Sequence, residues 1–157
     1  MKRNKGAKKT RDTLQVWSLN QARAAIPYLS SVLRSMREHV LVALAANHRS
    51  KRITAKPGRT TRRDMVAIQE AEHEARQAES RFQEAAGELE EIDVFTLDPV
   101  RGQALIPFVQ DEQLAWYIFD LFDNKPFRFW RFQSDPEDTR RPITPTQQGW
   151  TGTTQLA

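Results

Sequence analysis

The stretch MVAIQEAEHEARQAESRFQEAAGELEEID, residues 65–93, decides the fold. Its apolar residues recur at alternating intervals of three and four, the heptad spacing that places one apolar stripe along one side of a helix. The stripe consists of Ile68, Ala71, Ala75, Ala78, Phe82, Ala85, Leu89 and Ile92. The preceding Thr61-Arg62-Arg63-Asp64 predicts where the helix begins, because a negative charge in the first turn suits the helix dipole.

A second stripe with the same spacing lies upstream and predicts a second helix. It consists of Ile26, Leu29, Leu33, Met36, Val40 and Ala43. The segment Ser18-Leu19-Asn20-Gln21 predicts a capping box at the start of this helix, with Trp17 packed onto the first turn. Pro27 lies inside the pattern and removes a backbone donor, so we expect a kink near Arg23.

The two stripes fit together in an antiparallel register. In such a hairpin the numbers of facing residues add up to a constant, and the pairs from Ile26 with Ile92 to Ala43 with Ala75 all add up to 118. Half of that value is 59, and the turn-forming Pro57-Gly58-Arg59 lies there. We therefore predict a coiled-coil-like helical hairpin over residues 18–92, with each helix about 45 Å long.

After Asp93 the pattern changes to short segments rich in aromatic and β-branched residues, separated by turn residues. These segments are residues 94–97, 103–109, 114–121 and 127–133. They predict an antiparallel meander of three or four strands over residues 94–143, with one face covering the base of the hairpin near Ile26 and Ile92. The fold class is therefore α+β, with a single domain over residues 14–143.

The two ends of the chain carry no pattern that could form a core. Residues 1–13 hold six basic side chains and predict a disordered basic arm, and residues 144–157 predict a mobile tail. No apolar run is long enough to span a membrane, and the basic start leads into no apolar run, so we expect neither a membrane span nor a secretory signal. The chain has no cysteine, which fits a reducing, cytoplasmic location.

Short motifs in this order resemble a prokaryotic family known only as domain of unknown function 2203. Its members open with a pattern like F-[ST]-L-x-x-A-x-x-x-L-P, continue as a charged helical hairpin and end in a short β region. The counterparts here are Trp17-Ser18-Leu19, Ala22, Ile26-Pro27, Leu97-Asp98, Gly102-Gln103-Ala104-Leu105-Ile106-Pro107, Ile118-Phe119-Asp120-Leu121, Trp130-Arg131-Phe132 and Arg140-Arg141-Pro142-Ile143. The family's Cys, His, Glu and Asp positions are Ile118, Arg131, Phe132 and Leu105 in this chain. The resemblance implies a divergent member and brings no known activity.

Residues able to do chemistry do not converge in the predicted hairpin. His39 and His73 lie about six residues apart in register, roughly 9 Å, too far to share a metal ion. Acidic residues crowd the second helix, and we favour a charge match with Arg23, Arg34 and Arg37 of the first helix over an acid/base pair. No nucleophile, zinc or phosphate-loop motif occurs. We therefore expect no enzyme activity, metal or cofactor, and predict no small-molecule ligand.

Charge is divided unevenly along the chain. Residues 1–63 hold 16 Lys and Arg against two acids, and the remaining residues hold 8 against 18. Such asymmetry indicates either an anionic partner or an electrostatic match within the molecule. The predicted hairpin tip concentrates the positive charge and is the candidate polyanion-binding site. Its residues are Arg49, Lys51, Arg52, Lys56, Arg59, Arg62 and Arg63.

Three functions remain open at this point. The preferred one is a non-enzymatic interaction module that self-associates as a homo-oligomer, because the aromatic residues of the meander exceed what the base of one hairpin can bury. The second is weak binding of nucleic acid or another polyanion, without sequence preference, through the tip and the basic arm. The third is an enzyme of unknown type. Against the second stands a simpler interpretation, in which the tip is only a charged connector.

Overall fold

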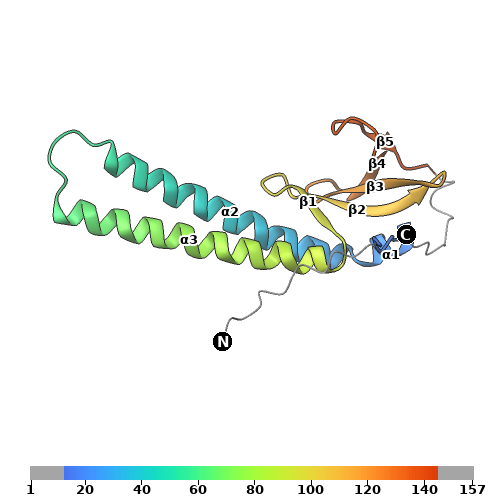
Figure 1. Ribbon diagram of the computed structural model, residues 1–157, viewed down its shortest axis with the longest axis horizontal. Helices are drawn as coiled ribbons and strands as arrows, with labels where there is room; N and C mark the ends of the chain where they lie inside the picture. The colour runs from blue at the N-terminus through green and yellow to red at the C-terminus, as the bar shows by residue number, and fades with distance from the viewer. Residues whose placement is uncertain (1–12, 145–157) are drawn as a thin grey trace.

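The computed structural model describes residues 13–144 and confirms the α+β prediction. Two long helices form a hairpin, and a five-stranded antiparallel sheet lies at its base (Figure 1). The helices are α1 (Leu19–Ala24), α2 (Ile26–Thr54) and α3 (Arg62–Glu91); the strands are β1 (Phe95–Asp98), β2 (Gln103–Gln110), β3 (Gln113–Asp120), β4 (Phe127–Phe132) and β5 (Arg141–Pro142). Apart from Thr13 and Thr144, the predicted basic arm and tail lie outside the described residues.

Capping boxes begin the helices where the sequence predicts. Ser18 Oγ accepts a hydrogen bond from the Gln21 amide, and the Gln21 side chain accepts one from the Ser18 amide. Thr61 and Asp64 repeat the arrangement at the start of α3. The predicted kink is a full break at Ala25, which separates α1 from α2, because Pro27 cannot donate to a carbonyl of the preceding turn.

Two contacts between the helices fix the antiparallel register. The Tyr28 hydroxyl donates to Glu88 over 2.6 Å, and Arg49 pairs with Glu74. The numbers of these pairs add up to 116 and 123, on either side of the predicted 118. Residues 55–61 connect α2 with α3, and Gly58 adopts a left-handed φ of 99° in that connection. The expected hairpin and its turn are therefore confirmed.

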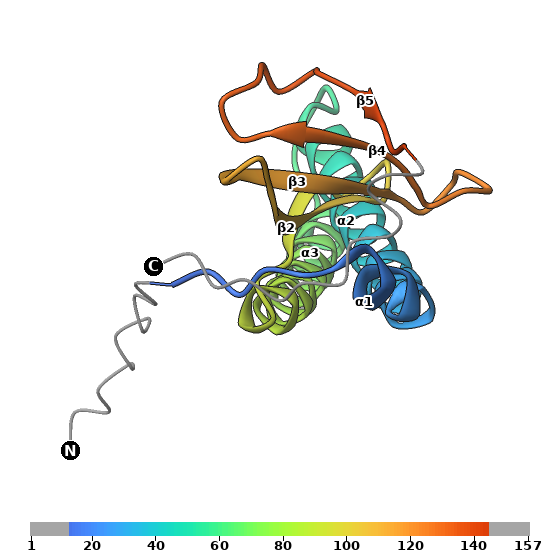
Figure 2. The same ribbon diagram turned by 90° about the vertical axis from the view of Figure 1, so that its right-hand side faces the viewer.

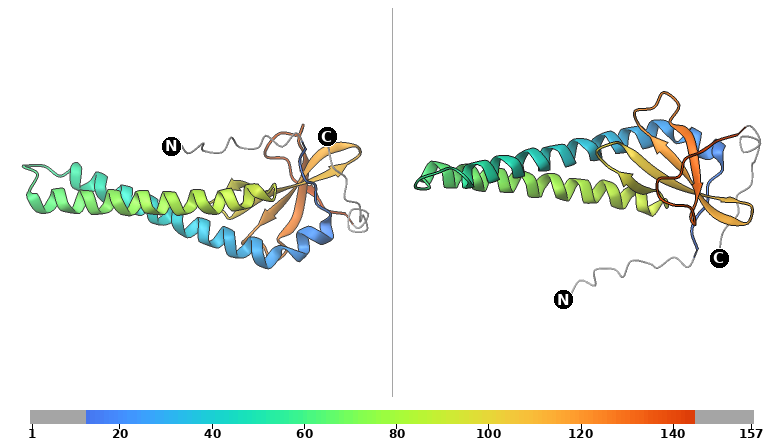
Figure 3. Two further views of the ribbon diagram at one scale, coloured as in Figure 1. Left: turned by 60° about the horizontal axis from the view of Figure 1, so that its bottom comes forward. Right: turned by 90° about the horizontal axis from the view of Figure 1, so that it is seen from above.

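The arm of the molecule, which we define as residues 37–81 of the hairpin, extends beyond the sheet (Figure 1). Its helices lie close together, and towards the base they diverge (Figure 3). The buried side chains change accordingly. In the arm they are Ala43, Ala46, Ala71, Ala75 and Ala78, and at the base they are Leu29, Leu33, Met36 and Leu89. Small residues let the helices approach, while the larger ones pack into a core shared with the sheet.

The sheet runs in sequence order from β1 to β5, with every neighbouring pair antiparallel. In the view along the hairpin, β2 lies on the helix side of β3 and β5 lies furthest from α3 (Figure 2), while β1, which follows α3 in the chain, contacts that helix. Alternate residues of the strands face the helices and form the core. They include Ala104, Ile106, Phe108, Ala115, Tyr117, Phe119, Phe127 and Trp130. The meander is confirmed, with one short strand, β5, beyond the three or four that the sequence predicts.

The segment before α1 is fastened to both the helices and the sheet. The Trp17 amide donates to the Pro107 carbonyl over 2.8 Å, and its indole Nε1 donates to the Ile92 carbonyl over 3.2 Å. The Gln15 amide donates to the Asp93 carboxylate over 2.9 Å. Residues 15–17 therefore close the open side of the core between α3 and β2.

Candidate functional site

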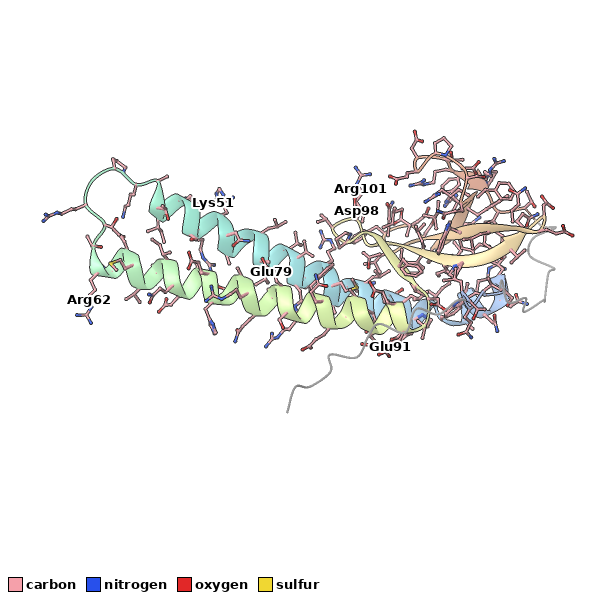
Figure 4. The ribbon with its side chains drawn as sticks, viewed as in Figure 1. Lys51, Arg62, Glu79, Glu91, Asp98 and Arg101 are labelled. Atoms are coloured by element: carbon pink, nitrogen blue, oxygen red, sulfur yellow. The ribbon has the colours of Figure 1, made fainter. Side chains whose placement is uncertain are left out.

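The seven basic residues of the tip are all exposed and surround the far end of the arm. Arg49, Lys51 and Arg52 belong to the last turns of α2, Lys56 and Arg59 to the connection, and Arg62 and Arg63 to the first turn of α3. Figure 4 shows Lys51 and Arg62 at the end of the molecule opposite the sheet. The hairpin thus brings all the predicted tip residues together.

Only part of this charge is compensated. Arg49 pairs with Glu74, and Lys56 lies 3.7 Å from Asp64. The Thr61 amide, which donates to the Asp64 carboxylate, holds the pKa of that group below its ordinary value, and Lys56 adds to the effect. The other five basic residues of the tip have no carboxylate within 4 Å in residues 13–144. The tip therefore keeps a net positive field.

A hollow of about 500 Å³ lies at the start of α3, beside the tip. Its lining combines Arg62 and Arg63 with Val66, Ala67 and Glu70. The two arginines could hold a phosphate, but the Glu70 carboxylate on the same wall opposes an anion. The hollow therefore favours no particular ligand class.

The predicted charge match between the helices takes a different form. Within the described chain, Arg23, Arg34 and Arg37 form no ion pair with a carboxylate of α3. Arg37 instead turns to the sheet, where its Nε donates to the Val100 carbonyl over 2.9 Å and its guanidinium lies 5.1 Å from the Phe122 ring centre. The ion pair that does join α2 with α3 is Arg49 with Glu74, further out on the arm. Much of the acidic charge near the base of α3 therefore remains available to a partner.

The histidines lie apart, as the register implies. His39 is half-buried and shares a hydrogen bond of 3.2 Å with Ser35 Oγ, whereas His48 and His73 are exposed. In the described part of the chain, no three His, Asp or Glu side chains are grouped so that they could hold a metal ion. No helix among residues 13–144 is both long and apolar enough to cross a membrane.

An exposed apolar surface that the sequence did not reveal lies where the arm meets the sheet. Leu41 and Leu44 follow Arg37 by one and two turns of α2, so they lie on the same side of that helix. Arg37 contacts Val100 and Phe122, which stand on the loops that overhang α2 near the labelled Asp98 and Arg101 (Figure 4). Leu44 is 55% and Phe122 64% exposed. We call Leu41, Leu44, Val100 and Phe122 the junction surface.

The junction surface continues into a groove between the helices. This groove has a volume of about 210 Å³, and Val40, Ala43, Leu44 and Phe82 form its apolar part, with Glu79 and Gln83 on α3. The sequence led us to expect more aromatic side chains in the meander than the base of one hairpin can bury. Most of them are in fact buried or half-buried, and only Phe122 is largely exposed. The apolar surface available to a partner therefore belongs mainly to the arm.

Comparison with known proteins gives no relative. No family model matches the chain, and no curated protein or solved structure matches it either.

Proposed function

We propose that this protein is a non-enzymatic interaction module that self-associates through its arm. The single observation that carries the proposal is the junction surface, in which two leucines of α2 and the Phe122 ring are exposed in the region where the arm meets the sheet. Exposed apolar surface gathered in one region marks interaction sites in proteins. We also propose that the chain belongs to the family that its sequence resembles, domain of unknown function 2203. This membership assigns no activity to the protein.

The construction of the arm supports this function. Among residues 13–144, the part of the arm beyond the sheet consists of two helices packed against each other, and the residues buried between them are alanines. Burial of an alanine side chain removes little apolar area from water, so this seam stabilises the arm weakly. If the two helices of a second arm packed against the first arm, they would bury Leu41 and Leu44 and complete a four-helix bundle.

The distribution of charge favours a second copy as the partner and an antiparallel arrangement of the arms. The tip is basic, whereas residues 84–92 of the chain carry the exposed Glu84, Glu88, Glu90 and Glu91 and no basic residue. Antiparallel arms place the basic tip of one copy beside the acidic base of the other. Complementary charge of this kind fixes the orientation of an interface.

Sedimentation equilibrium of the full chain tests the proposal. The wild type is expected to reach twice the chain mass of 18.2 kDa, and Leu41→Glu with Leu44→Glu is expected to remain at the chain mass. The matched control carries the same charge change on exposed residues of α3, Gln77→Glu with Ser80→Glu, and should associate as the wild type does. A monomeric wild type at high micromolar concentration would refute self-association.

Polyanion binding by the tip is the second candidate, because five of its seven basic side chains lack a carboxylate partner within residues 13–144. If the tip binds polyanions, the logarithm of the affinity for DNA should fall linearly with the logarithm of the salt concentration, with a slope of about −0.9 per phosphate contacted. Replacing all seven basic residues of the tip by Gln should remove most of the slope. Replacing Arg76 and Arg81, exposed on α3, should leave most of it, and equal DNA retention by both variants would exclude the tip.

A further inference from the structure

A cavity of about 540 Å³ opens where the break between α1 and α2 meets the last two strands. This volume is within the range of small-molecule sites, roughly 300–1,000 Å³. The side chains of Ile26, Phe127 and Ile143 form its apolar wall together with two prolines, and Arg23, Lys125 and Arg128 stand around it. Within residues 13–144, the lining contains no acidic residue. The cavity is thus apolar inside and basic at its edge.

Backbone hydrogen bonds hold the walls in place. The Ile143 amide donates to the Arg128 carbonyl over 3.0 Å, which prolongs the pairing of β4 with β5 to the edge of the cavity. On the other side, the Asp120 amide donates to the Pro126 carbonyl over 2.9 Å. Ile26 is the first residue of α2, whose first turn holds no acidic residue to offset the positive end of the helix dipole. The cavity is therefore preformed and its helix-facing wall favours an anion.

The charges at the edge differ in how far they are compensated. Arg128 donates to both Asp123 oxygens over 2.7 and 2.9 Å and to Asn124 over 3.0 Å, so its charge is balanced and its position fixed. These bonds hold the pKa of Asp123 at about 2. Arg23 and Lys125, in contrast, have no carboxylate within 4 Å in the described chain. Two basic side chains without counter-charge thus face the same opening.

A tyrosine lies beside the same wall. Tyr117 is only 2% exposed. Its ring lies against Phe127, with 6.2 Å between the ring centres. Burial raises the pKa of Tyr117 to about 12, and the nearby charge of Arg23 acts in the opposite direction. Tyr117 therefore lies near Phe127 and Arg23, two residues of the lining.

We propose that this cavity binds a small organic acid, with its carboxylate between Arg23 and Lys125 and its apolar body against Ile26, Phe127 and Ile143. Charge-assisted hydrogen bonds from the two basic side chains select the anion. The apolar wall selects an acid with a hydrocarbon body over a bare phosphate. The site is independent of the junction surface and does not depend on self-association.

Nuclear magnetic resonance of the ¹⁵N-labelled full chain tests the site, with sodium octanoate as the probe. Octanoate should shift the amide signals of Phe127, Arg128 and Ile143, and neutral octanamide should bind more weakly by about tenfold or more. Arg23→Gln and Lys125→Gln should each lower the affinity by a similar factor. Arg34→Gln, which removes an exposed arginine outside the cavity, is the matched control and should change nothing.

A second variant separates a cavity from a merely basic surface. Ile143→Trp fills the apolar volume and keeps all three basic residues, so it should abolish octanoate binding while the remaining spectrum shows an intact fold. The proposal is overturned if octanoate shifts none of these signals, if octanamide or inorganic phosphate binds equally well, or if Ile143→Trp binds octanoate as the wild type does.

Discussion

At Asp93 the backbone adopts a left-handed φ of 59°, a conformation that glycine usually supplies at the end of a helix. The Val94 amide donates to the Leu89 carbonyl and the Asp93 amide to the Glu90 carbonyl, each over 3.0 Å, which is the Schellman arrangement that ends α3. The buried Asp93 carboxylate accepts a hydrogen bond from the Gln15 amide. An aspartate is therefore retained where glycine would fit, because its side chain fastens the segment before α1.

Asp93→Ala should destabilise the protein by about 1–3 kcal/mol, since it leaves the Gln15 amide without its acceptor and keeps the unfavourable φ. Asp93→Asn should cost less, because asparagine tolerates the left-handed region and still offers an oxygen. Urea unfolding of the two variants beside the wild type measures both free energies. Equal losses for Ala and Asn would contradict this role of the side chain.

Two aspartates at the sheet predict how stability depends on pH. Hydrogen bonds from Arg128 and Arg141 hold the pKa values of Asp123 and Asp135 at about 2, below the ordinary 3.8. A lowered pKa in the folded state stabilises the fold above pH 3.8, and this contribution is lost as the pH falls towards 2. The melting temperature should therefore drop over that interval.

Between pH 5 and pH 2, the melting temperature of the double variant Asp123→Asn with Asp135→Asn should fall less than the melting temperature of the wild type. The control is Glu137→Gln with Asp138→Asn, because these carboxylates form no ion pair in residues 13–144. If both double variants follow the wild type over this interval, the two aspartates do not contribute as described.

At the scale of the elements, the hairpin is held by different side chains along its length. The base is stabilised by large side chains that also contact the sheet, whereas the arm depends on a seam of alanines.

Leu33 is fully buried in the shared core. Leu33→Ala should therefore cost about 2–5 kcal/mol in urea unfolding. Met65→Ala, which truncates a side chain that is 54% exposed on the arm, should change stability by less than about 0.5 kcal/mol. Similar losses for both would contradict this division.

The helices and main strands could be predicted because their signals are local. Heptad spacing, the capping box at Ser18, the helix start at Thr61 and the Pro57-Gly58 turn each act within a few residues, and the register followed from matching the two stripes. Strand β5 could not be predicted, since Arg141 and Pro142 carry no strand pattern. Arg141 is held by Asp135 at 2.8 Å and by stacking over the rings of Trp130 and Phe132, contacts that exist only after the sheet has formed.

The whole molecule shows why only part of its candidate sites could be found from the sequence. The basic tip lies in one stretch of the chain, residues 49–63, which holds seven basic residues and no acidic one. Composition alone therefore located it. The junction surface combines Leu41 and Leu44, which lie outside the predicted stripe, with Val100 and Phe122 from loops far along the chain. The cavity likewise joins Arg23 to Lys125 and Ile143. Such sites depend on which loops the fold brings over which helix, and periodicity carries no information about that.

The arm also explains how charge asymmetry along the chain becomes asymmetry in space. The hairpin places the basic tip at one end of α3 and the acidic residues 84–91 at the other end of the same helix, which is about 45 Å long. Within one copy these charges are too far apart to neutralise each other, because exposed charges are screened beyond about 10 Å at 0.1 M salt. The proposed antiparallel association of two arms would bring them together without any change in the fold.

Energy transfer between two singly labelled populations tests the antiparallel association most directly. The chain has no cysteine, so Thr60→Cys labels the tip and Asn20→Cys labels the base, each at a single exposed position. The dyes should have a transfer range well below the length of α3, about 45 Å. Antiparallel arms predict strong transfer when tip-labelled chains are mixed with base-labelled chains, and weak transfer between tip-labelled chains. Strong transfer between two tips, or none in either mixture at concentrations where the wild type is dimeric, would contradict the account.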